Sequence, residues 1–326
     1  MGEFDLIRRY FQRPARRAVL GVGDDCALLA PRAGMQLAVS CDMLVQDRHF
    51  FADTDALRLG HKALAVNLSD LAATGARPLA FTLALALPAI DEAWLQAFSD
   101  GLLRLADLHD CELVGGDTTK GPLNICITVF GEVPAGQALL RSGARPGDDI
   151  WVSGQLGDAR LALEALLGNI TLDDAVLAQA RERLEAPTPR LALGQALRGI
   201  ATSALDISDG LLGDLGHILD QSGVGATVEI ESTIDLLASR AFSTSISNRF
   251  DPDFLLQCTL AGGDDYELCF TAPTSLRPAV QQAAGRSHTR VTRIGGIDAE
   301  QGLRLRAPDG ALLQPRWRSF DHFSGP

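Results

Sequence analysis

Carboxylate side chains recur beside glycines along this chain, and their type and spacing could support metal chemistry. In the first such group, Gly21-Val22-Gly23-Asp24-Asp25, two glycines bend the backbone and present adjacent carboxylates. Adjacent carboxylates repel, so a folded protein tolerates them only when they are solvated or neutralised by a cation. Mg²⁺ is usually held by a few carboxylates together with substrate phosphates. Because a single turn of this kind is more often a solvated surface turn, the magnesium hypothesis depends on repetition.

The pattern is repeated through both halves of the chain, at glycine turns, at the expected ends of strands and once inside a helix. The aspartates concerned are Asp24, Asp25, Asp42, Asp70, Asp117, Asp206, Asp209, Asp264 and Asp265. If even half of them converge, their repulsion at low dielectric amounts to several kcal/mol, which cations would offset. Oxygen ligands without a His or Cys pattern select Mg²⁺ or Mn²⁺ over zinc.

Simpler interpretations exist for some of these residues. Asp70 falls in an apolar stretch, 55–73, that predicts a buried helix, so it is either a hydrogen-bonded structural residue or a metal ligand. Ser208 and Asp209 stand where N-cap residues of the next helix would, although this leaves Asp206 unexplained. The bland alternative is that all nine aspartates are solvated turns and caps.

Glycine-rich backbone accompanies the carboxylates, most clearly at Gly115-Gly116-Asp117. Glycines let a ligand approach closely, and free N–H groups can cradle phosphate oxygens. Clustered Mg²⁺ and such backbone are typical of phosphoryl transfer. The chain contains no Gly-x-x-x-x-Gly-Lys-Ser/Thr stretch, which excludes a P-loop protein.

Composition narrows the class further. A length of 326 residues predicts about two domains, and 46% hydrophobic residues provide material for buried cores. A net charge of −12 argues against a nucleic-acid partner. Six scattered cysteines without a Cys-x-x-Cys pair indicate neither a zinc site nor a disulfide framework. With no signal peptide and no apolar run long enough for a membrane span, we expect a reduced, cytoplasmic protein that does not bind membranes.

Hydrophobic periodicity places the motifs on alternating helices and strands. Expected helices cover 3–12, 55–73, 92–108, 158–167, 174–184, 190–199 and a stretch from Leu211. Expected strands cover 37–40, 79–87, 112–114, 123–133, 150–153, 204–206 and 268–270. The Pro/Gly/Asp segment 144–148 predicts a boundary between domains 1–145 and 146–326. Ser69-Asp70 echoes Ser208-Asp209, and Gly115-Gly116-Asp117 echoes Gly262-Gly263-Asp264, which favours two similar α/β halves.

The ordered set of motifs resembles the thiamine-monophosphate kinases, a family within the aminoimidazole-ribonucleotide-synthetase-like superfamily. The resemblance spans residues 3 to 323. It rests on Gly21–Asp25, Ser40-Cys41-Asp42, His49, Asn67–Asp70, Gly115–Thr118, Leu140–Gly143, Asp206–Gly210, Gly262–Glu267 and Phe320-Asp321-His322-Phe323. It implies two PurM-like α/β (α+β) domains, each a mixed sheet flanked by helices, with the active site in the cleft between them. The first domain would bind metal and ATP and form a homodimer.

The resemblance also implies roles for individual residues. Several Mg²⁺ ions would be held by Asp25, Ser40, Cys41, Asp42, Asp70, Asp117, Asp206 and Asp209. ATP would contact Gly116, Asp117, Arg141 and Ser208, and thiamine monophosphate would contact His49, Asp264 and Phe320. Asp42, Asp117 and Asp206 would be the catalytic residues. The implied reaction makes thiamine diphosphate from ATP and thiamine monophosphate.

Two positions depart from the family pattern. Cys41 stands where the family often has Thr, and a metal contact through the backbone carbonyl would survive that change. Asp264 stands where Glu is expected, so its shorter side chain leaves room for a water between carboxylate and substrate.

Other functions stay open at this point. A selenophosphate synthetase would want a reactive Cys or selenocysteine in a glycine-rich N-terminal segment, but the first cysteine is Cys26. A hydrogenase-maturation protein would want a C-terminal Cys, but the chain ends Ser324-Gly325-Pro326. Aminoimidazole ribonucleotide synthetase shares the superfamily motifs. A non-catalytic Mg²⁺–nucleotide sensor is the alternative from another class.

Overall fold

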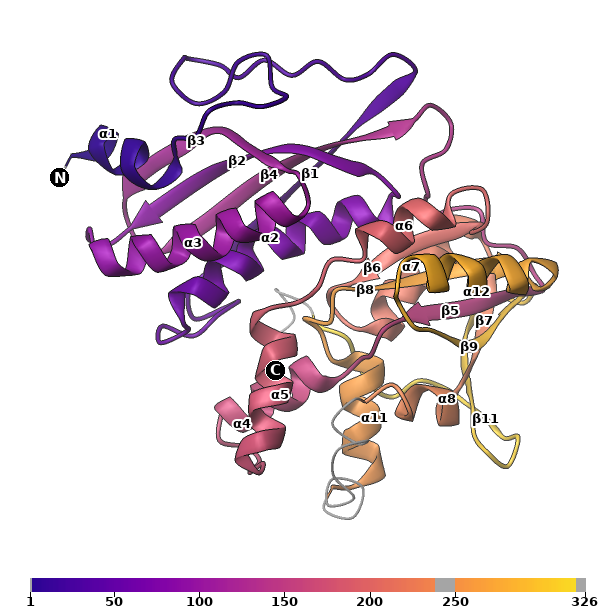
Figure 1. The fold of residues 1–326 in the computed structure, drawn as a ribbon. Coiled ribbons are helices and arrows are strands. Elements are labelled where there is room, and N and C mark those ends of the chain that lie inside the picture. Colours follow the sequence, from indigo (N-terminus) through magenta and orange to yellow (C-terminus); the bar gives the residue numbers. More distant parts are fainter. Residues whose placement is uncertain (1, 238–249, 321–326) are drawn as a thin grey trace. The chain divides into compact units, whose positions relative to one another are not determined.

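The chain divides into two units, each built on its own sheet (Figure 1). The computed structural model describes residues 2–237 and 250–320. Unit 1 holds the residues up to Leu71 together with Ala76–Ala138, and unit 2 holds Ala72–Gly75 and the residues from Leu139 on. This division precedes the predicted boundary at 145/146. The reason is that Leu139 N donates to Thr74 O at 3.1 Å and Ala204 N to Leu140 O at 2.9 Å, which ties this stretch to unit 2.

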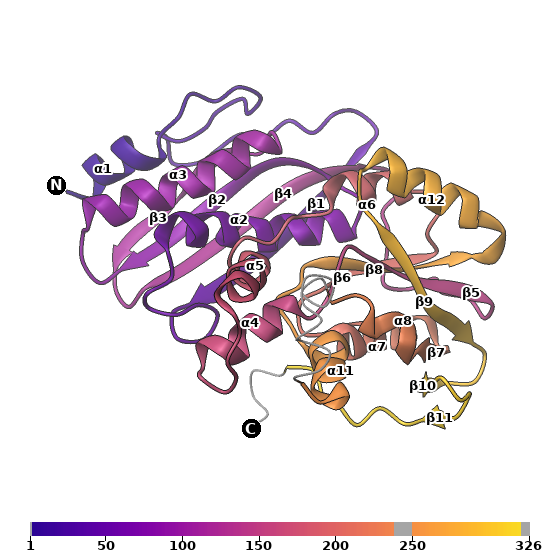
Figure 2. The ribbon, with the colours of Figure 1, turned by 60° about the horizontal axis from the view of Figure 1, so that its bottom comes forward.

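Unit 1 is a four-stranded mixed sheet with two long helices. The strands are, in sheet order, β1 (Met35–Val45), β4 (Asn124–Pro134), β2 (Arg77–Leu87) and β3 (Glu112–Lys120). Only the β2–β3 pair is parallel. The helices α2 (Ala56–Ala73) and α3 (Glu92–Leu108) lie on one face of the sheet in both views (Figures 1 and 2). At the N-terminus, α1 (Glu3–Leu6) continues into the π-helical turn η1 (Ile7–Phe11).

The strand β2 shows why one face of this sheet is covered. Leu83, Leu85 and Leu87 alternate along β2 and are buried, whereas Ala84 between them is exposed. Alternating side chains point to opposite faces of a strand, so the leucines face the helices. The prediction of a buried helix over 55–73 is confirmed by α2, whose Leu64 and Leu68 are fully buried.

Two local predictions for unit 1 are wrong. Asp42 lies inside β1, because β1 stays paired with β4 as far as Val45. Gly115 and Gly116 lie within β3, where they pair with Thr82 and Leu83 directly after a shift of register at Val114, so these glycines do not end the strand. The prediction of two α/β halves is confirmed, although the echoed motifs differ locally: Ser69-Asp70 lies inside α2, whereas Ser208-Asp209 lies in the turn before α7.

Unit 2 carries a seven-stranded sheet with order β11-β10-β7-β9-β5-β8-β6. The strands are β5 (Asp148–Ser153), β6 (Ser203–Ile207), β7 (Gly225–Glu229), β8 (Glu267–Pro273), β9 (Val291–Asp298), β10 (Gly302–Arg306) and β11 (Leu312–Leu313). The helices are α4 (Asp158–Leu166), α5 (Asp174–Glu185), α6 (Leu191–Leu197), α7 (Leu211–Ser222), α8 (Ile230–Ile234), α11 (Pro252–Ala261), the 3₁₀ turn η2 (Thr274–Leu276) and α12 (Arg277–Arg286).

A core of aliphatic side chains joins α7 to the sheet of unit 2. Leu211, Leu215 and Ile218 recur on one side of α7 and are fully buried with Ile150 and Ile207 from the strands. This spacing of three and four residues is that of an amphipathic helix face. The packing fixes the N-terminus of α7 at the end of β6. Among the described residues, no helix is both long and apolar enough to cross a membrane.

Candidate functional site

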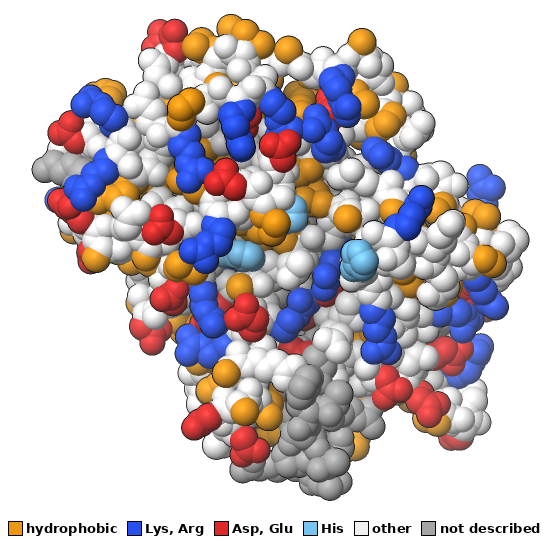
Figure 3. All heavy atoms as spheres, viewed as in Figure 1, with side chains coloured by type: hydrophobic (Ala, Val, Ile, Leu, Met, Phe, Trp, Pro, Cys, Tyr) orange, Lys and Arg blue, Asp and Glu red, His pale blue; other side chains and the backbone are white. Residues whose placement is uncertain are grey.

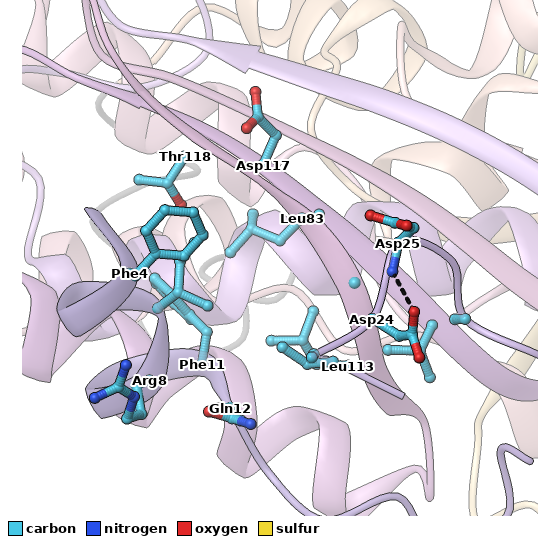
Figure 4. Close-up of a pocket in the computed structure, with 17 residues that line it drawn as sticks. Phe4, Arg8, Phe11, Gln12, Asp24, Asp25, Leu83, Leu113, Asp117 and Thr118 are labelled. Carbon is cyan, nitrogen blue, oxygen red and sulfur yellow. Dashed lines mark hydrogen bonds between the residues drawn. The ribbon is translucent and has the colours of Figure 1, made fainter. Parts of the chain in front are cut away.

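A cavity of about 640 Å³ in unit 1 collects one set of the predicted residues (Figure 4). Its lining includes Asp24 and Asp25 from the glycine turn and Gly116 and Asp117 from β3. Figure 4 shows the two turn aspartates across the cavity from the aromatic side chains of the N-terminal helix. Asp25 N donates to Asp24 Oδ1 at 2.9 Å, which holds the turn in its bent form. The cavity therefore offers carboxylate oxygens, backbone N–H groups and an apolar wall.

Gly116 lies on β3 beside this cavity, two residues after the shift of register between β2 and β3. Its φ is +149°, and a Cβ at this position would stand 1.9 Å from the carbonyl oxygen of Leu83. No side chain fits there, so the glycine is required by the close approach of β2 and β3. The bulge also sets the direction of Asp117, the next residue.

A second group of unit 1 lies between β1 and α2. Ser40 Oγ donates to Asp70 Oδ2 at 2.5 Å, which makes Asp70 a hydrogen-bonded carboxylate at the sheet face. Asn67 accepts from Asp42 N at 3.0 Å and donates from its amide to Ala63 O at 3.0 Å. Asn67 was part of a motif in the sequence but had no predicted role. Asn67 is polar, lies on an otherwise apolar helix and stands three residues before Asp70, on the same helix face. These features could have indicated a role in the site.

The sheet keeps Asp42 apart from Asp117 within one chain. Asp42 is on β1 and Asp117 on β3, with β4 and β2 between them, a separation of about 14 Å at the usual strand spacing. They also point to opposite faces, since Asp42 shares the helix-covered face with Ser40 while Asp117 pairs with the exposed Ala84. In the described part of the chain, no three His, Cys, Asp or Glu side chains come together as a metal-binding group. The two aspartates of one chain therefore cannot bind one ion, and their metal roles stay predictions.

His49 and Cys41 flank this region without entering it. His49 Nδ1 accepts a hydrogen bond from Val45 N at 3.0 Å, so the neutral ring carries its proton on Nε2 and presents a donor there. Cys41 projects from the uncovered face of β1, where its sulfur lies 3.5 Å from that of Cys126 on β4. A contact of Cys41 with metal would have to use its backbone, as predicted for this substitution.

In unit 2 the predicted residues gather where β6 leads into α7. Asp206 is at the end of β6, and Ser208 and Asp209 form the turn, with Gly210 as the N-cap of α7. The carboxylate of Asp214, on the first turn of α7, accepts the backbone N–H groups of Ser208, Asp209 and Gly210, each at 3.1 Å. The predicted N-cap role therefore falls to Gly210, and Asp214 supplies the missing acceptor.

Asp214 is a residue that the sequence reasoning missed. Burial raises its pKa to about 7, against the opposing effect of the three hydrogen bonds. Its position four residues after Gly210 was the available signal, because a carboxylate in the first turn can satisfy unpaired N–H groups.

The segment between α11 and β8 lies against the same turn. Asp264 N donates to Ser208 O and Tyr266 N donates to Ile207 O, both at 2.8 Å. Asp264 and Tyr266 have φ values of +65° and +49°, which non-glycine residues rarely adopt. Strained backbone of this kind persists where surrounding contacts over-determine it, as at ligand sites.

The neighbouring acidic residues of this segment point into the interior. Asp265 is buried, accepts from Gly157 N at 2.9 Å, and has its pKa raised well above the usual range by burial. Glu267 is fully buried and binds Arg183 at 2.7 Å and Arg190 at 2.5 Å. Asp265, one of the nine aspartates of the sequence pattern, therefore belongs to the structural support of Asp264.

Phe320 belongs to the group around Asp209 and Arg141 does not. Phe320 N donates to Asp209 O at 3.0 Å, and its ring is 48% exposed. Arg141 is at the opposite end of α7, where its carbonyl accepts from Ser222 Oγ at 3.5 Å. Twelve helical residues separate the two ends by about 18 Å. The predicted residues Asp321, His322 and Phe323 lie outside the described residues.

Charged side chains of both signs lie on the surface. Basic and acidic side chains are interspersed over the face seen in Figure 3, and arginines frequently stand beside carboxylates. In unit 1, Arg9 pairs with Glu92 and Arg13 pairs with Asp107, each at 2.8 Å.

Comparisons with known proteins assign each of the two units to a protein family. Residues 23–133 match the family "AIR synthase related protein, N-terminal domain", and residues 145–307 match "AIR synthase related protein, C-terminal domain". The thiamine-monophosphate kinase of Escherichia coli strain K12 is 46% identical over 330 residues, covering 100% of this chain and 99% of that protein. The corresponding kinase of Haemophilus influenzae is 44% identical over 334 residues, covering 99% of this chain and 98% of that protein.

Solved structures give the same result. The crystal structure of the thiamine-monophosphate kinase from Stenotrophomonas maltophilia K279a matches with a TM-score of 0.82 and 46% identity, covering 95% of this chain and 96% of that one. A structure of AaThiL complexed with AMPPCP and TMP matches with a TM-score of 0.76 and 28% identity, covering 90% and 89%. A hydrogenase maturation protein HypE from E. coli shares the fold, with a TM-score of 0.74 at 20% identity over 99% of this chain and 97% of that one.

Proposed function

Since the chain belongs to the thiamine-monophosphate kinases, within the AIR synthase related proteins, we propose that it transfers the γ-phosphoryl group of ATP to thiamine monophosphate. The product is thiamine diphosphate. The observation that carries this function is the 46% identity to a kinase of that activity over the full length of the chain. Some of the predicted motif residues support it: Asp25, Gly116 and Asp117 line one cavity of unit 1, and Asp206, Ser208 and Asp209 lie together at the β6–α7 turn of unit 2.

The acceptor needs little help from the protein to become a nucleophile. A phosphate monoester has a second pKa of about 6, so thiamine monophosphate is already a dianion at neutral pH. No general base is therefore required. The main barrier is the repulsion between two polyanions, which positioning and charge neutralisation reduce.

Magnesium fits the donors that the chain presents. The residues that would hold it are the predicted ligands Asp25, Ser40, Asp42, Asp70, Asp117, Asp206 and Asp209, with Cys41 contributing its carbonyl. These are oxygen donors, and the bond of 2.5 Å between Ser40 and Asp70 already orients one carboxylate. When bound, Mg²⁺ would neutralise phosphate charge and polarise the transferred group. Asp42, Asp117 and Asp206 are proposed as the catalytic members of this set.

The remaining predicted residues suit the two substrates. The backbone beside Gly116, together with Ser208 and Arg141, is proposed to contact ATP. His49 offers an Nε2–H donor, and the half-exposed Phe320 ring offers a face on which a cationic thiazolium could stack. Asp264 would meet thiamine monophosphate directly or through a water.

We expect direct in-line transfer without a phosphorylated enzyme. Transfer from ATP carrying a chiral γ-phosphorus should invert its configuration. Retention of configuration, or a trapped phospho-residue after incubation with ATP alone, would contradict the direct mechanism.

Coupled ADP release, scanned over phosphate-bearing acceptors with Mg²⁺ present, tests the function. Turnover should require thiamine monophosphate, and formylglycinamidine ribotide should give none. Turnover with the ribotide would instead identify an aminoimidazole ribonucleotide synthetase. ATP binding without ADP release beside any acceptor would identify a nucleotide sensor. Removing Mg²⁺ with EDTA should abolish turnover, and adding it back should restore turnover.

A homodimer formed through unit 1 is part of the same proposal. The uncovered face of β1 carries apolar side chains, with Leu37, Val39 and Met43 exposed by 46%, 56% and 53%. A row of exposed apolar side chains on one strand face is typical of an interaction surface. The occupant we propose is the same face of a second copy. A cytoplasmic location, where ATP is made, completes the proposal.

A further inference from the structure

The last described residues of the chain, Ser319 and Phe320, are fastened to the N-terminus of α7. Phe320 N donates to Asp209 O at 3.0 Å. The hydroxyl of Ser319 accepts from Gly213 N at 2.9 Å and donates to Gly210 O at 3.3 Å. A segment without secondary structure thus makes three hydrogen bonds to one turn of backbone.

Ser319 supplies what the helix itself lacks. The N-cap of α7 is Gly210, which has no side chain to accept the N–H groups of the first turn. Asp214 satisfies the N–H groups of Ser208, Asp209 and Gly210, and Ser319 satisfies that of Gly213. Its hydroxyl acts as an N-cap group from a residue 106 positions away in the sequence.

The contact also depends on Gly213 having no side chain. A Cβ there would stand 2.7 Å from Ser319 Cβ and 2.8 Å from Ser319 Oγ. Gly216, one turn further along α7, has nothing within 4 Å of the same hypothetical atom. The two glycines therefore differ in what surrounds them although they share one helix.

The same turn holds both unit 2 residues that are proposed to bind thiamine monophosphate. The backbone N–H of Asp264 donates to Ser208 O, and that of Phe320 donates to Asp209 O. Trp317 packs on the core cluster of α7, which anchors the segment just before Ser319. The hydrogen bonds of Ser319 therefore fix the backbone immediately before Phe320.

We propose that Ser319 is a positioning residue for thiamine monophosphate: its hydroxyl, seated on Gly213 and Gly210, holds Phe320 where the thiazolium ring stacks. The inference rests on the proposed function, because it assigns a role within that substrate site. Ser319 touches no reacting group, so it acts on substrate affinity through Phe320.

Steady-state kinetics of four variants test this. Ser319→Ala removes both side-chain hydrogen bonds, and Gly213→Ala displaces the hydroxyl from the other side of the contact. Both should raise the KM for thiamine monophosphate about tenfold, the effect of losing one or two hydrogen bonds, with kcat and the KM for ATP changed less than about twofold. Gly216→Ala is the matched control, and it should leave all three constants unchanged.

A double-variant cycle shows whether Ser319 acts through Phe320. Phe320→Ala should raise the same KM, and adding Ser319→Ala to it should raise it no further, because the residue that Ser319 positions is already gone. Independent, multiplying effects of the two substitutions would overturn the inference.

Thermal unfolding separates positioning from a general loss of structure. Gly216→Ala should raise Tm by about 2–4 °C through helix propensity. The Tm of Gly213→Ala should lie no more than about 4 °C below that of the wild type. A large drop in Tm with both KM values raised would show a merely structural role and overturn the inference. If the wild type is active and the Ser319→Ala and Gly213→Ala variants keep a normal KM for thiamine monophosphate, the inference is overturned but the proposed function stands. A wild type without turnover on thiamine monophosphate would overturn the proposed function as well.

Discussion

At the scale of single residues, the aspartates of this chain fall into distinct physical situations. Asp24 and Asp25 are exposed at a cavity, Asp70 is held by Ser40, and Asp265 is buried. In the sequence these aspartates look alike, because each lies near a glycine or a small polar residue. Only the first two situations suit a metal ligand, because a carboxylate that binds metal must be ionised and accessible.

Asp42→Asn should abolish turnover, with kcat/KM reduced by at least about a hundredfold, because it removes a charge proposed to hold magnesium. The fold should survive, since the backbone N–H of residue 42 still reaches Asn67. Without metal the variant should unfold at a slightly higher temperature, because a repelling charge is gone.

Asp47→Asn is the control for Asp42→Asn. Asp47 is exposed in the following loop and has a φ of +62°, a conformation that Asn also tolerates. It should keep full activity. Full activity in the Asp42 variant would remove that residue from the proposed catalytic set.

At the scale of elements, the positions of the site residues depend on how strands pair. The helix over 55–73 and the helix over 92–108 were predicted within a residue or two, because their apolar periodicity is strong. The path of β3 through Gly115 and Gly116 was not predicted, because the sequence reads as a turn and pairing with β2 overrides it. Tertiary pairing decided the local structure there.

Gly116→Ala should destabilise the protein by about 3 kcal/mol or more, because its Cβ would overlap the carbonyl of Leu83 and its φ disfavours a side chain. Gly115→Ala is the matched control: its Cβ would lie 3.8 Å from Thr82 Cγ2, an ordinary contact. It should change stability by less than about 1 kcal/mol. Urea unfolding of both variants measures the difference, and equal losses would contradict the close approach of β2 and β3.

Asp149 on β5 joins α12 and β9 through Arg277 and Arg293, each at 2.6 Å. The hydrogen bond from Arg277 lowers the pKa of Asp149, and the hydrogen bond from Arg293 lowers it further. Burial acts in the opposite direction but is outweighed. A lowered pKa means that the carboxylate stabilises the fold above the unfolded value near 3.9 and that this is lost as pH falls through the folded value.

Asp149→Asn should therefore cost about 1–3 kcal/mol at pH 7, through lost charge-assisted hydrogen bonds. The difference from the wild type should shrink as pH falls below about 4. Urea unfolding at pH 7 and at pH 3.5 measures it. A difference that stays constant between the two would show that the ionised form of Asp149 is not what stabilises the fold.

At the scale of the whole molecule, unit 1 presents two kinds of surface. The uncovered face of β1 is apolar, whereas exposed ion pairs such as Arg9–Glu92 and Arg13–Asp107 lie near the N-terminal helix. A second copy of the chain is the proposed occupant of the β1 face. We expect that the two copies can be separated without unfolding unit 1.

Val39→Lys should convert the proposed dimer to a monomer, because two lysines would be buried against each other at the contact. Light scattering coupled to size-exclusion chromatography measures the mass. Leu108→Lys, at an exposed position at the end of α3, is the matched control and should leave the mass unchanged. Dimers of unchanged stability in the Val39 variant would place the contact elsewhere.

Local sequence patterns were enough to predict the α/β class, the two halves, most helices and the acidic motifs, because periodicity and glycine–carboxylate pairs are local signals. They could not predict that two strands separate Asp42 from Asp117, that Arg141 is distant from Ser208, or that Ser319 caps α7. These relations follow from strand order and from contacts between residues remote in the chain, and the free energy that selects them comes from burial and pairing, which no local stretch encodes.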